Sequence, residues 1–196
     1  MEHYFTQNPS GEYNEKTLTV HIAGRKMEFI AADGVFSKNA LDYGTSVLLD
    51  AFFKEHQSVG TLLDLGCGYG PIGISAAVVT GAKSTMRDIN QRAVELAKKN
   101  AQANGIYPDI SQGDGYENIN GIFDVIITNP PIRAGKSVYY PWIENAPQHL
   151  NEKGEFWAVA QKKQGADSLK KFMKSTFGNC EVVARDSGYY VLKSIK

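Results

Sequence analysis

Apolar and polar positions along this chain follow two different rhythms. Five short runs have the apolar character of buried strands, at 61–65, 83–87, 108–112, 123–128 and 154–160. Apolar residues at helical spacing occupy four segments, at about 72–79, 91–104, 138–149 and 166–176. Because the alternating segments leave room for right-handed crossovers, the pattern predicts an α/β fold with a mostly parallel sheet covered on both faces.

The two ends of the chain depart from this rhythm. Residues 17–22 and 26–31 alternate around a short turn, which predicts an N-terminal β-hairpin. A further helix is expected to begin near Gly44-Thr45-Ser46. The segments 181–184 and 189–195 are too close in sequence for a crossover, so we expect the last strand to be antiparallel.

Composition describes an ordinary globular chain. Its 196 residues carry 21 basic and 21 acidic side chains, and 42% are apolar, which is enough to bury a core. No apolar run approaches the roughly 20 residues that cross a bilayer, and Met1 to Phe5 lacks the features of an export signal. We therefore expect a cytoplasmic protein with no membrane partner. The two cysteines show no metal-ligand spacing, so we expect no metal.

A glycine-rich loop, Asp64-Leu65-Gly66-Cys67-Gly68-Tyr69-Gly70, lies between the first parallel strand and the following helix. This is where an α/β sheet binds its ligand. Glycines permit positive φ and a close approach of the ligand, and the free N–H groups at a helix start receive a carboxylate or phosphate. Residues 68–73 also satisfy the GxGxxG pattern, so a nicotinamide or flavin enzyme remains open at this point.

Three aspartates follow the expected strands. Asp64 is placed to face a cationic ligand, Asp88 to hold ribose hydroxyls, and Asp114 to meet an adenine amino group. A capping or turn role is the alternative for each of them. These acids alone fit more than one nucleotide-type cofactor.

The sequence Asn129-Pro130-Pro131 discriminates between these cofactors, because it follows a buried strand that delivers it to the same edge of the sheet. Each proline fixes its own φ and restricts the residue before it, so the Asn129 side chain and the Pro130 carbonyl are expected to be rigid acceptors. Two acceptors on its hydrogens would favour a pyramidal amine nitrogen aimed at a methyl donor. Alignment and electrostatics could then supply most of the acceleration.

With these residues the chain resembles the class I S-adenosylmethionine-dependent methyltransferases, and more narrowly the small-domain group related to the ribosomal RNA guanine-N2 methyltransferases. The resemblance also includes Gly34-Val35-Phe36-Ser37, Asp42-Tyr43-Gly44-Thr45, Asp88-Ile89-Asn90 and the continuation of the proline motif to Lys136. It implies a Rossmann-like, seven-stranded sheet, with a hairpin and substrate-side loop at 1–40 and a catalytic domain at 41–196. It also implies that S-adenosylmethionine is the cofactor.

On this basis the candidate catalytic residues are Asn129, Pro130 and Pro131. The candidate cofactor-binding residues are Thr45, Asp64, Gly66, Cys67, Gly68, Gly70, Asp88, Ile89, Asp114, Gly115 and Asn129. The candidate substrate-binding residues are Phe36, Ile132, Arg133 and Lys136, with Lys162-Lys163 as a further basic pair. We treat Trp142 as a packing residue and build no general base from any histidine.

Two positions differ from the pattern of the family. Ile132 stands where related nucleic-acid enzymes often have an aromatic residue, so Phe36, Tyr139 or Tyr140 would have to provide a stacking face. Arg87 stands where an apolar strand residue is more usual, and we expect it to point outward.

The favoured hypothesis is an N-methyltransferase that modifies an exocyclic base amine, with guanine N2 of ribosomal RNA as the acceptor and RNA as the partner. The zero net charge means that RNA would have to meet a local basic surface. The alternatives are a protein glutamine or small-molecule N-methyltransferase, and a non-catalytic RNA-binding module with the same fold.

Overall fold

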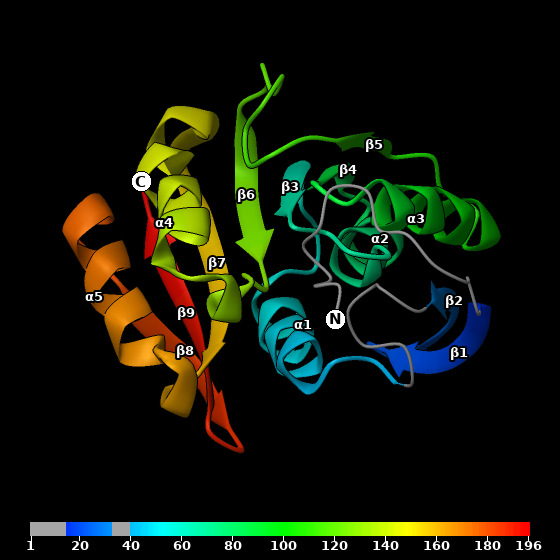
Figure 1. Cartoon of the computed structure of the whole chain (residues 1–196), viewed down its shortest axis with the longest axis horizontal. Coiled ribbons are helices and arrows are strands. Elements are labelled where there is room, and N and C mark those ends of the chain that lie inside the picture. The colour runs from blue at the N-terminus through cyan, green and yellow to red at the C-terminus, as the bar shows by residue number, and fades with distance from the viewer. Residues whose placement is uncertain (1–14, 33–39) are drawn as a thin grey trace.

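The computed structural model describes residues 15–32 and 40–196. A seven-stranded sheet forms its centre, in the order β5-β4-β3-β6-β7-β9-β8, and a separate two-stranded hairpin precedes it (Figure 1). The strands of the sheet are β3 (Thr61–Leu65), β4 (Lys83–Asp88), β5 (Asp109–Gln112), β6 (Phe123–Thr128), β7 (Leu150–Gln161), β8 (Glu181–Asp186) and β9 (Tyr189–Ile195). The helices are α1 (Tyr43–Glu55), α2 (Pro71–Thr80), α3 (Gln91–Ala103), α4 (Lys136–Asn145) and α5 (Ala166–Phe177). Three short 3-10 helices complete the described chain, namely η1 (Ile132–Ala134), η2 (Ala146–His149) and η3 (Lys162–Gln164).

The first five strands of the sheet pair in parallel, and β9 is antiparallel to both β7 and β8. The predicted mostly parallel sheet with an antiparallel last strand is therefore confirmed. The central strands are buried on both faces, as the uninterrupted apolar run Val125, Ile126 and Ile127 of β6 requires.

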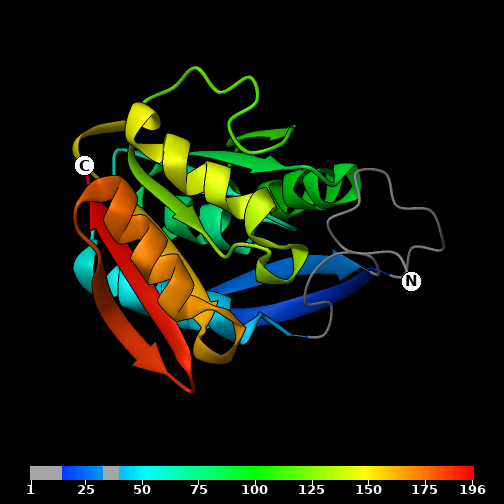
Figure 2. The same cartoon turned by 60° about the vertical axis from the view of Figure 1, so that its left-hand side comes forward.

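Two hydrophobic layers cover the sheet. Helices α1, α2 and α3 pack on one face and α4 and α5 on the other, as the two views show (Figures 1 and 2). Phe52 of α1 and Trp157 of β7 meet edge to face in the first layer, with ring centroids 5.3 Å apart. Leu169 and Met173 of α5 are fully buried in the second layer.

The N-terminal hairpin consists of β1 (Glu15–Ile22) and β2 (Arg25–Ala32), joined by a two-residue turn in which Ala23 and Gly24 both have positive φ. Its apolar side joins the same hydrophobic core as α1–α3. The side chain of Asn100 in α3 is buried, and its Oδ1 atom accepts from the Ile30 N–H at 2.6 Å. Its Nδ2 group donates to the Ile30 carbonyl at 2.9 Å and to the Tyr69 carbonyl at 2.8 Å. A single side chain thus joins the hairpin to the glycine-rich loop. The division into segments 1–40 and 41–196 stays a prediction.

Element boundaries differ from the predictions at a few places. The segment predicted as one helix over 138–149 is α4 followed by η2. Pro147 explains the break, because it has no N–H to continue the helical hydrogen bonds. β7 begins four residues earlier than expected, where it passes the irregular pairing of β6 between Phe123 and Val125. No helix in the described part of the chain is long and apolar enough to cross a membrane.

Candidate active site

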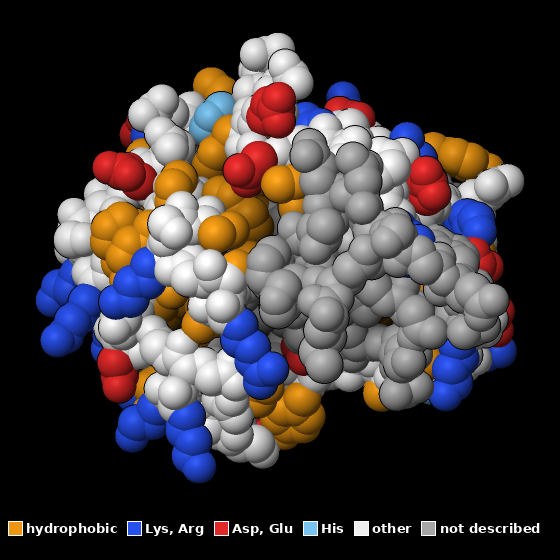
Figure 3. All heavy atoms as spheres, viewed as in Figure 1, with side chains coloured by type: hydrophobic (Ala, Val, Ile, Leu, Met, Phe, Trp, Pro, Cys, Tyr) orange, Lys and Arg blue, Asp and Glu red, His pale blue; other side chains and the backbone are white. Residues whose placement is uncertain are grey.

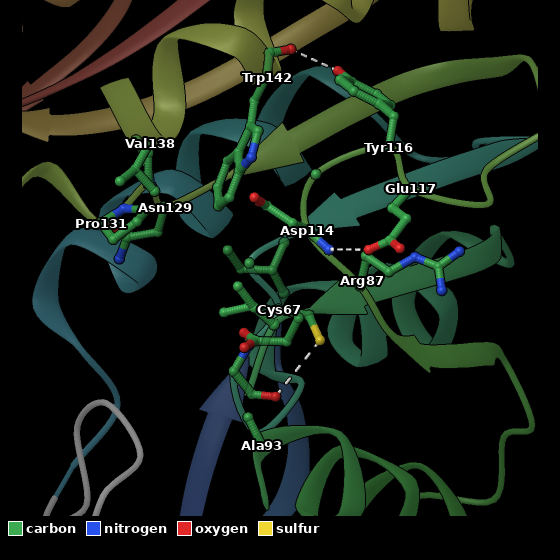
Figure 4. Close-up of a pocket in the computed structure, with 18 of the residues that line it drawn as sticks. Cys67, Arg87, Ala93, Asp114, Tyr116, Glu117, Asn129, Pro131, Val138 and Trp142 are labelled. Carbon is green, nitrogen blue, oxygen red and sulfur yellow. Dashed lines mark hydrogen bonds between the residues drawn. The ribbon is translucent and has the colours of Figure 1, made fainter. Parts of the chain in front are cut away.

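A cavity of about 600 Å³ opens at the carboxyl ends of β3, β4, β5 and β6, within the size range of small-molecule sites (Figure 4). Three loops that are distant in sequence meet there: the glycine-rich loop, the 113–117 loop and the Asn-Pro-Pro turn. Of the residues predicted for the site, the cavity is lined by Thr45, Gly66, Cys67, Gly68, Asp88, Ile89, Asp114, Gly115, Asn129, Pro130 and Pro131.

The glycine-rich loop takes a conformation that ordinary residues rarely adopt. Gly66, Gly68 and Gly70 all have positive φ, between 56° and 96°. The space around Gly68 is open, whereas a Cβ on Gly70 would lie 2.6 Å from the Ile74 side chain. Gly68 therefore borders the cavity, and Gly70 turns toward the core and lies outside the cavity lining.

Asp88 holds this loop in place. Its carboxylate accepts one hydrogen bond from the Gly68 N–H and one from the Asn90 N–H, both at 2.8 Å. Burial raises the pKa of Asp88, while the backbone N–H groups oppose that rise. A carboxylate has about four lone-pair sites, so Asp88 can still accept hydrogen bonds from ligand hydroxyls in the cavity that it lines.

Asp64 lies behind the loop and outside the cavity lining. It is fully buried, and one carboxylate oxygen accepts from the Gly73 N–H at 2.8 Å. The other oxygen has no hydrogen-bond partner among the described residues. Burial, with a smaller contribution from the charge of Asp88, raises the pKa of Asp64 from its ordinary value of 3.8 to about 7, against the effect of the Gly73 N–H. Its cofactor contact stays a prediction, although a buried oxygen without a partner suits a cationic ligand group.

Trp142 forms the opposite wall, a role that the sequence interpretation missed. A Cβ on Gly115 would lie 2.9 Å from its Cδ1 atom, and a Cβ on Gly66 would lie 3.0 Å from its Cη2 atom. The indole therefore lies against two loops at positions where both carry glycine. Val138, Trp142 and Asn145 share one face of α4 and all line the cavity. Their spacing of four and three residues in the sequence indicates that they share one face of a helix.

Two further residues extend this wall. The Tyr116 hydroxyl donates to the Trp142 carbonyl at 2.7 Å, and burial raises the pKa of Tyr116. The Tyr116 and His149 rings stack with centroids 4.2 Å apart and planes 3° from parallel. Asp114 is exposed at the mouth of the cavity, where its N–H donates to Glu117 at 3.3 Å.

The prediction that Arg87 points outward is wrong. Arg87 is only 5% exposed and lines the cavity near Asp114 and Glu117 (Figure 4). Its guanidinium donates to the Ser111 hydroxyl and, at 3.4 Å, to the Gln112 carbonyl. A Cβ on Gly113 would lie 3.1 Å from the Arg87 Cδ atom, so the aliphatic stem fills the space beneath the 113–117 loop.

Asn129 is fixed by two residues at the start of α1. Its Nδ2 group donates to the Asp42 carboxylate at 2.8 Å and to the Thr45 hydroxyl at 3.0 Å. Asp42 is the N-cap of α1 and also accepts from the Thr45 N–H at 2.9 Å. Because an ionised carboxylate only accepts hydrogen bonds, Nδ2 has to face Asp42. The amide oxygen of Asn129 is then left for a ligand.

The prolines that follow are equally constrained. Pro131 has φ −74° and ψ 72°, and the Ile132 N–H donates to the Pro130 carbonyl at 2.8 Å, which is an inverse γ-turn. This bond fixes the direction of the Pro130 carbonyl and uses one of its two lone pairs. The second lone pair stays available beside Asn129.

The predicted substrate residues lie outside the cavity lining, and Phe36 lies outside the described residues. Ile132 is half-buried, whereas Arg133 and Lys136 are exposed. The suggestion that Tyr139 offers a stacking face is wrong, because Tyr139 is 2% exposed within the core. The Tyr140 ring already stacks on Phe172 of α5, with centroids 3.8 Å apart.

Comparisons with known proteins place this chain in a family. A family model described as Methyltransferase small domain matches residues 26–193. A Bacillus subtilis protein named YbxB and described as uncharacterized is 42% identical over all of this chain and 98% of its own length. Ribosomal RNA small subunit methyltransferase C of Haemophilus influenzae is 36% identical over 90% of this chain, and that of Aeromonas hydrophila is 34% identical over 86%.

Among solved structures, a Thermus thermophilus 16S rRNA N2 G1207 methyltransferase in complex with AdoMet and guanosine has a TM-score of 0.86 at 24% identity. The similarity covers 96% of this chain and 52% of that one. The chain thus spans about half the length of the ribosomal RNA methyltransferases that it matches.

Proposed function

Because this chain belongs to the methyltransferase small-domain family, we propose that it methylates an exocyclic base amine, with guanine N2 of ribosomal RNA as the acceptor. Family membership confirms the sequence-based prediction of a methyltransferase. The related structure in complex with AdoMet supports S-adenosylmethionine as the methyl donor. The relatives named for ribosomal RNA methylation support the choice of acceptor.

The observation that carries the proposal is the orientation of Asn129. Two hydrogen bonds fix its Nδ2 group against Asp42 and Thr45, so that its oxygen is an acceptor at the edge of the cavity. The Pro130 carbonyl, fixed by the Ile132 N–H, is the second acceptor. Two rigid acceptors side by side match the two hydrogens of a primary amine.

The residues of the cavity fit the cofactor. Asp88 offers carboxylate lone pairs for ribose hydroxyls, Gly68 leaves room for close approach, and Asp114 with Gly115 borders the space next to the indole of Trp142. The buried Asp64 carboxyl lies behind the loop, with one oxygen that has no hydrogen-bond partner among the described residues. When bound, S-adenosylmethionine supplies an already activated methyl group.

The protein then has to orient the amine. An exocyclic amine on a base is a poor nucleophile because its lone pair is delocalised into the ring. Hydrogen bonds from its two N–H groups to the Asn129 oxygen and the Pro130 carbonyl favour a pyramidal nitrogen whose lone pair points into the cavity. Preorganised acceptors of this kind also stabilise the positive charge that develops on the nitrogen. The amine proton released after transfer can pass to water.

Replacing Asn129 by Ala tests this assignment. We expect the variant to bind S-adenosylmethionine with unchanged affinity in calorimetry and to lose about 100-fold or more in turnover, since it lacks one preorganised acceptor. Transfer of labelled methyl groups to small-subunit ribosomal RNA, followed by mapping of the labelled nucleotide, is the measurement. Turnover equal to that of the unmodified protein would remove Asn129 from this role.

Replacing Asp88 by Ala is the complementary test. This variant should bind S-adenosylmethionine at least tenfold more weakly while its RNA affinity stays the same, because it loses the carboxylate that lines the cavity and holds the Gly68 N–H. Equal cofactor affinity would reject the ribose contact. Labelling confined to protein or to small molecules, with none in RNA, would reject the choice of acceptor.

A further inference from the structure

Five exposed cations either follow the Asn-Pro-Pro turn in sequence or lie on elements that adjoin the β8–β9 turn. They come from η1, the start of α4, η3 and the end of β8, and we call them the basic rim: Arg133, Lys136, Lys162, Lys163 and Arg185. Figure 3 shows Lys and Arg side chains over the part of the molecule that carries η1, η3 and α5. None of these residues belongs to the lining of the cavity.

Backbone pairing brings η3 to the β8–β9 turn. The Lys162 N–H donates to the Gly188 carbonyl at 2.8 Å, directly after Gln161 pairs with Tyr189 in the sheet. The Arg185 guanidinium lies 5.0 Å from the centroid of the Tyr190 ring on the same hairpin. Lys162 and Arg185 are thus placed by one rigid antiparallel unit.

The same hairpin contacts the start of α1. The Tyr43 hydroxyl hydrogen-bonds the Ser187 hydroxyl at 3.0 Å, and the Tyr43 and Tyr189 ring centroids are 5.7 Å apart. Desolvation raises the pKa of Tyr189, and the nearby charges of Asp42 and Arg133 act on it in opposite directions. The β8–β9 turn therefore contacts the start of α1, which orients Asn129.

No carboxylate of the described residues pairs with the rim. Across the parts of the chain that the structure describes, none of its five cations has a carboxylate within ion-pair distance, whereas Lys193 nearby pairs with Glu55 at 2.6 Å. In a chain with no net charge, five such cations on one side of a cavity form a local positive field. That field suits a polyanion rather than an isolated nucleotide.

One aromatic ring is exposed beside these charges. Tyr43 is 46% exposed and is adjacent in sequence to Asp42. Proteins that bind single-stranded RNA combine cations for the phosphates with aromatic rings on which unpaired bases stack. Here Arg133 follows the Asn-Pro-Pro turn and Tyr43 follows Asp42, so a cation and an aromatic ring both stand next to residues of the site.

We infer that the basic rim and Tyr43 bind the single-stranded RNA that flanks the methylated nucleotide, with phosphates on the cations and a neighbouring base on the Tyr43 ring. This inference rests on the proposed RNA acceptor. It explains how a chain with no net charge can hold a polyanion, and it gives the β8–β9 hairpin a role in choosing the substrate.

The test compares two triple variants that remove the same charge. Lys162→Gln/Lys163→Gln/Arg185→Gln alters the rim at a distance from Asn129. Lys54→Gln/Lys83→Gln/Lys98→Gln alters three exposed cations at the end of α1, the start of β4 and the surface of α3, and serves as the matched control. Fluorescence anisotropy with a labelled single-stranded RNA, at several salt concentrations, measures the affinity.

For the rim variant we expect Kd to rise about tenfold or more at low salt. The slope of log affinity against log salt should fall by about 2, since each lost phosphate contact on a single strand contributes about 0.7. The control variant should match the unmodified protein, and both should bind S-adenosylmethionine normally, which also reports an intact fold.

Tyr43 is tested separately, because its substitution leaves the charge unchanged. Tyr43→Ala should weaken RNA binding about tenfold without altering the salt slope, and Tyr43→Phe, which keeps the ring and loses only the Ser187 bond, should bind like the unmodified protein. Equal RNA affinity of the rim variant and the control would overturn the inference while leaving the proposed function standing. An unmodified protein that binds no RNA and methylates another acceptor would overturn both.

Discussion

The orientation of the Asn129 amide depends on Asp42, and replacing Asp42 by Ser isolates that dependence. A serine hydroxyl can still cap α1 by accepting from the Thr45 N–H, but its side chain is one atom too short to reach the Asn129 Nδ2 group. The Thr45 hydroxyl stays as a partner, and a hydroxyl accepts or donates equally well. The amide therefore loses the partner that forces its oxygen toward the ligand.

The size of the effect follows from the bond that is lost. A hydrogen bond to a charged group contributes about 1.5–3 kcal/mol, and a tenfold change in rate corresponds to about 1.4 kcal/mol. We therefore expect kcat to fall about 10- to 100-fold. Stability should fall by at most about the same 1.5–3 kcal/mol, because the Asn129–Asp42 hydrogen bond is lost from the folded state, whereas serine and aspartate are similar N-caps.

Single-turnover methyl transfer to ribosomal RNA measures the rate of the chemical step, and calorimetry measures the affinity for S-adenosylmethionine. Asp42→Asn, which can present an oxygen to Asn129 in one of its two orientations, should lie between Asp42→Ser and the unmodified protein. A wild-type kcat for Asp42→Ser would refute the argument. A loss confined to cofactor affinity would assign Asp42 to binding instead of positioning.

Three further predictions concern stability and the shape of the cavity. Asp64 has its ordinary pKa of 3.8 in the unfolded chain and a pKa of about 7 in the folded protein, so between about pH 4 and pH 7 the unfolded chain loses this proton while the folded protein keeps it. The free energy of unfolding should therefore decline over this range by at most about 4 kcal/mol. Urea unfolding should show no such decline for Asp64→Asn. Gly115→Ala would place a Cβ 2.9 Å from the Trp142 ring and should weaken cofactor binding at least tenfold in calorimetry. Gly105 has a similar positive φ with open space around it, so Gly105→Ala should only lower the melting temperature. Asn100→Ala leaves buried partners on the hairpin and the glycine-rich loop unpaired, so chemical denaturation should show a loss of about 2–4 kcal/mol; a loss below about 1 kcal/mol would contradict the assigned role.

Patterns within short stretches were enough to predict the elements of the fold. The apolar run that ends at Thr128 identified a central strand, and the glycines from Gly66 to Gly70 identified the turn that follows the first parallel strand. Parallel strands present their carboxyl ends at one edge, so these patterns also indicated that the glycine-rich loop and Asn129 would line the same cavity. Local periodicity contains this information because side-chain direction repeats regularly along a strand or helix.

Only the tertiary structure decided which side chains meet. The partner that orients Asn129 is Asp42, 87 positions earlier, and the wall facing the glycine-rich loop is Trp142 of a helix on the other face of the sheet. Arg87 follows the same strand rhythm as its neighbours, yet it is buried because the 113–117 loop covers it. Such contacts depend on how separate elements pack in three dimensions. A residue pattern within one element specifies the face that a side chain takes, but not what lies opposite that face.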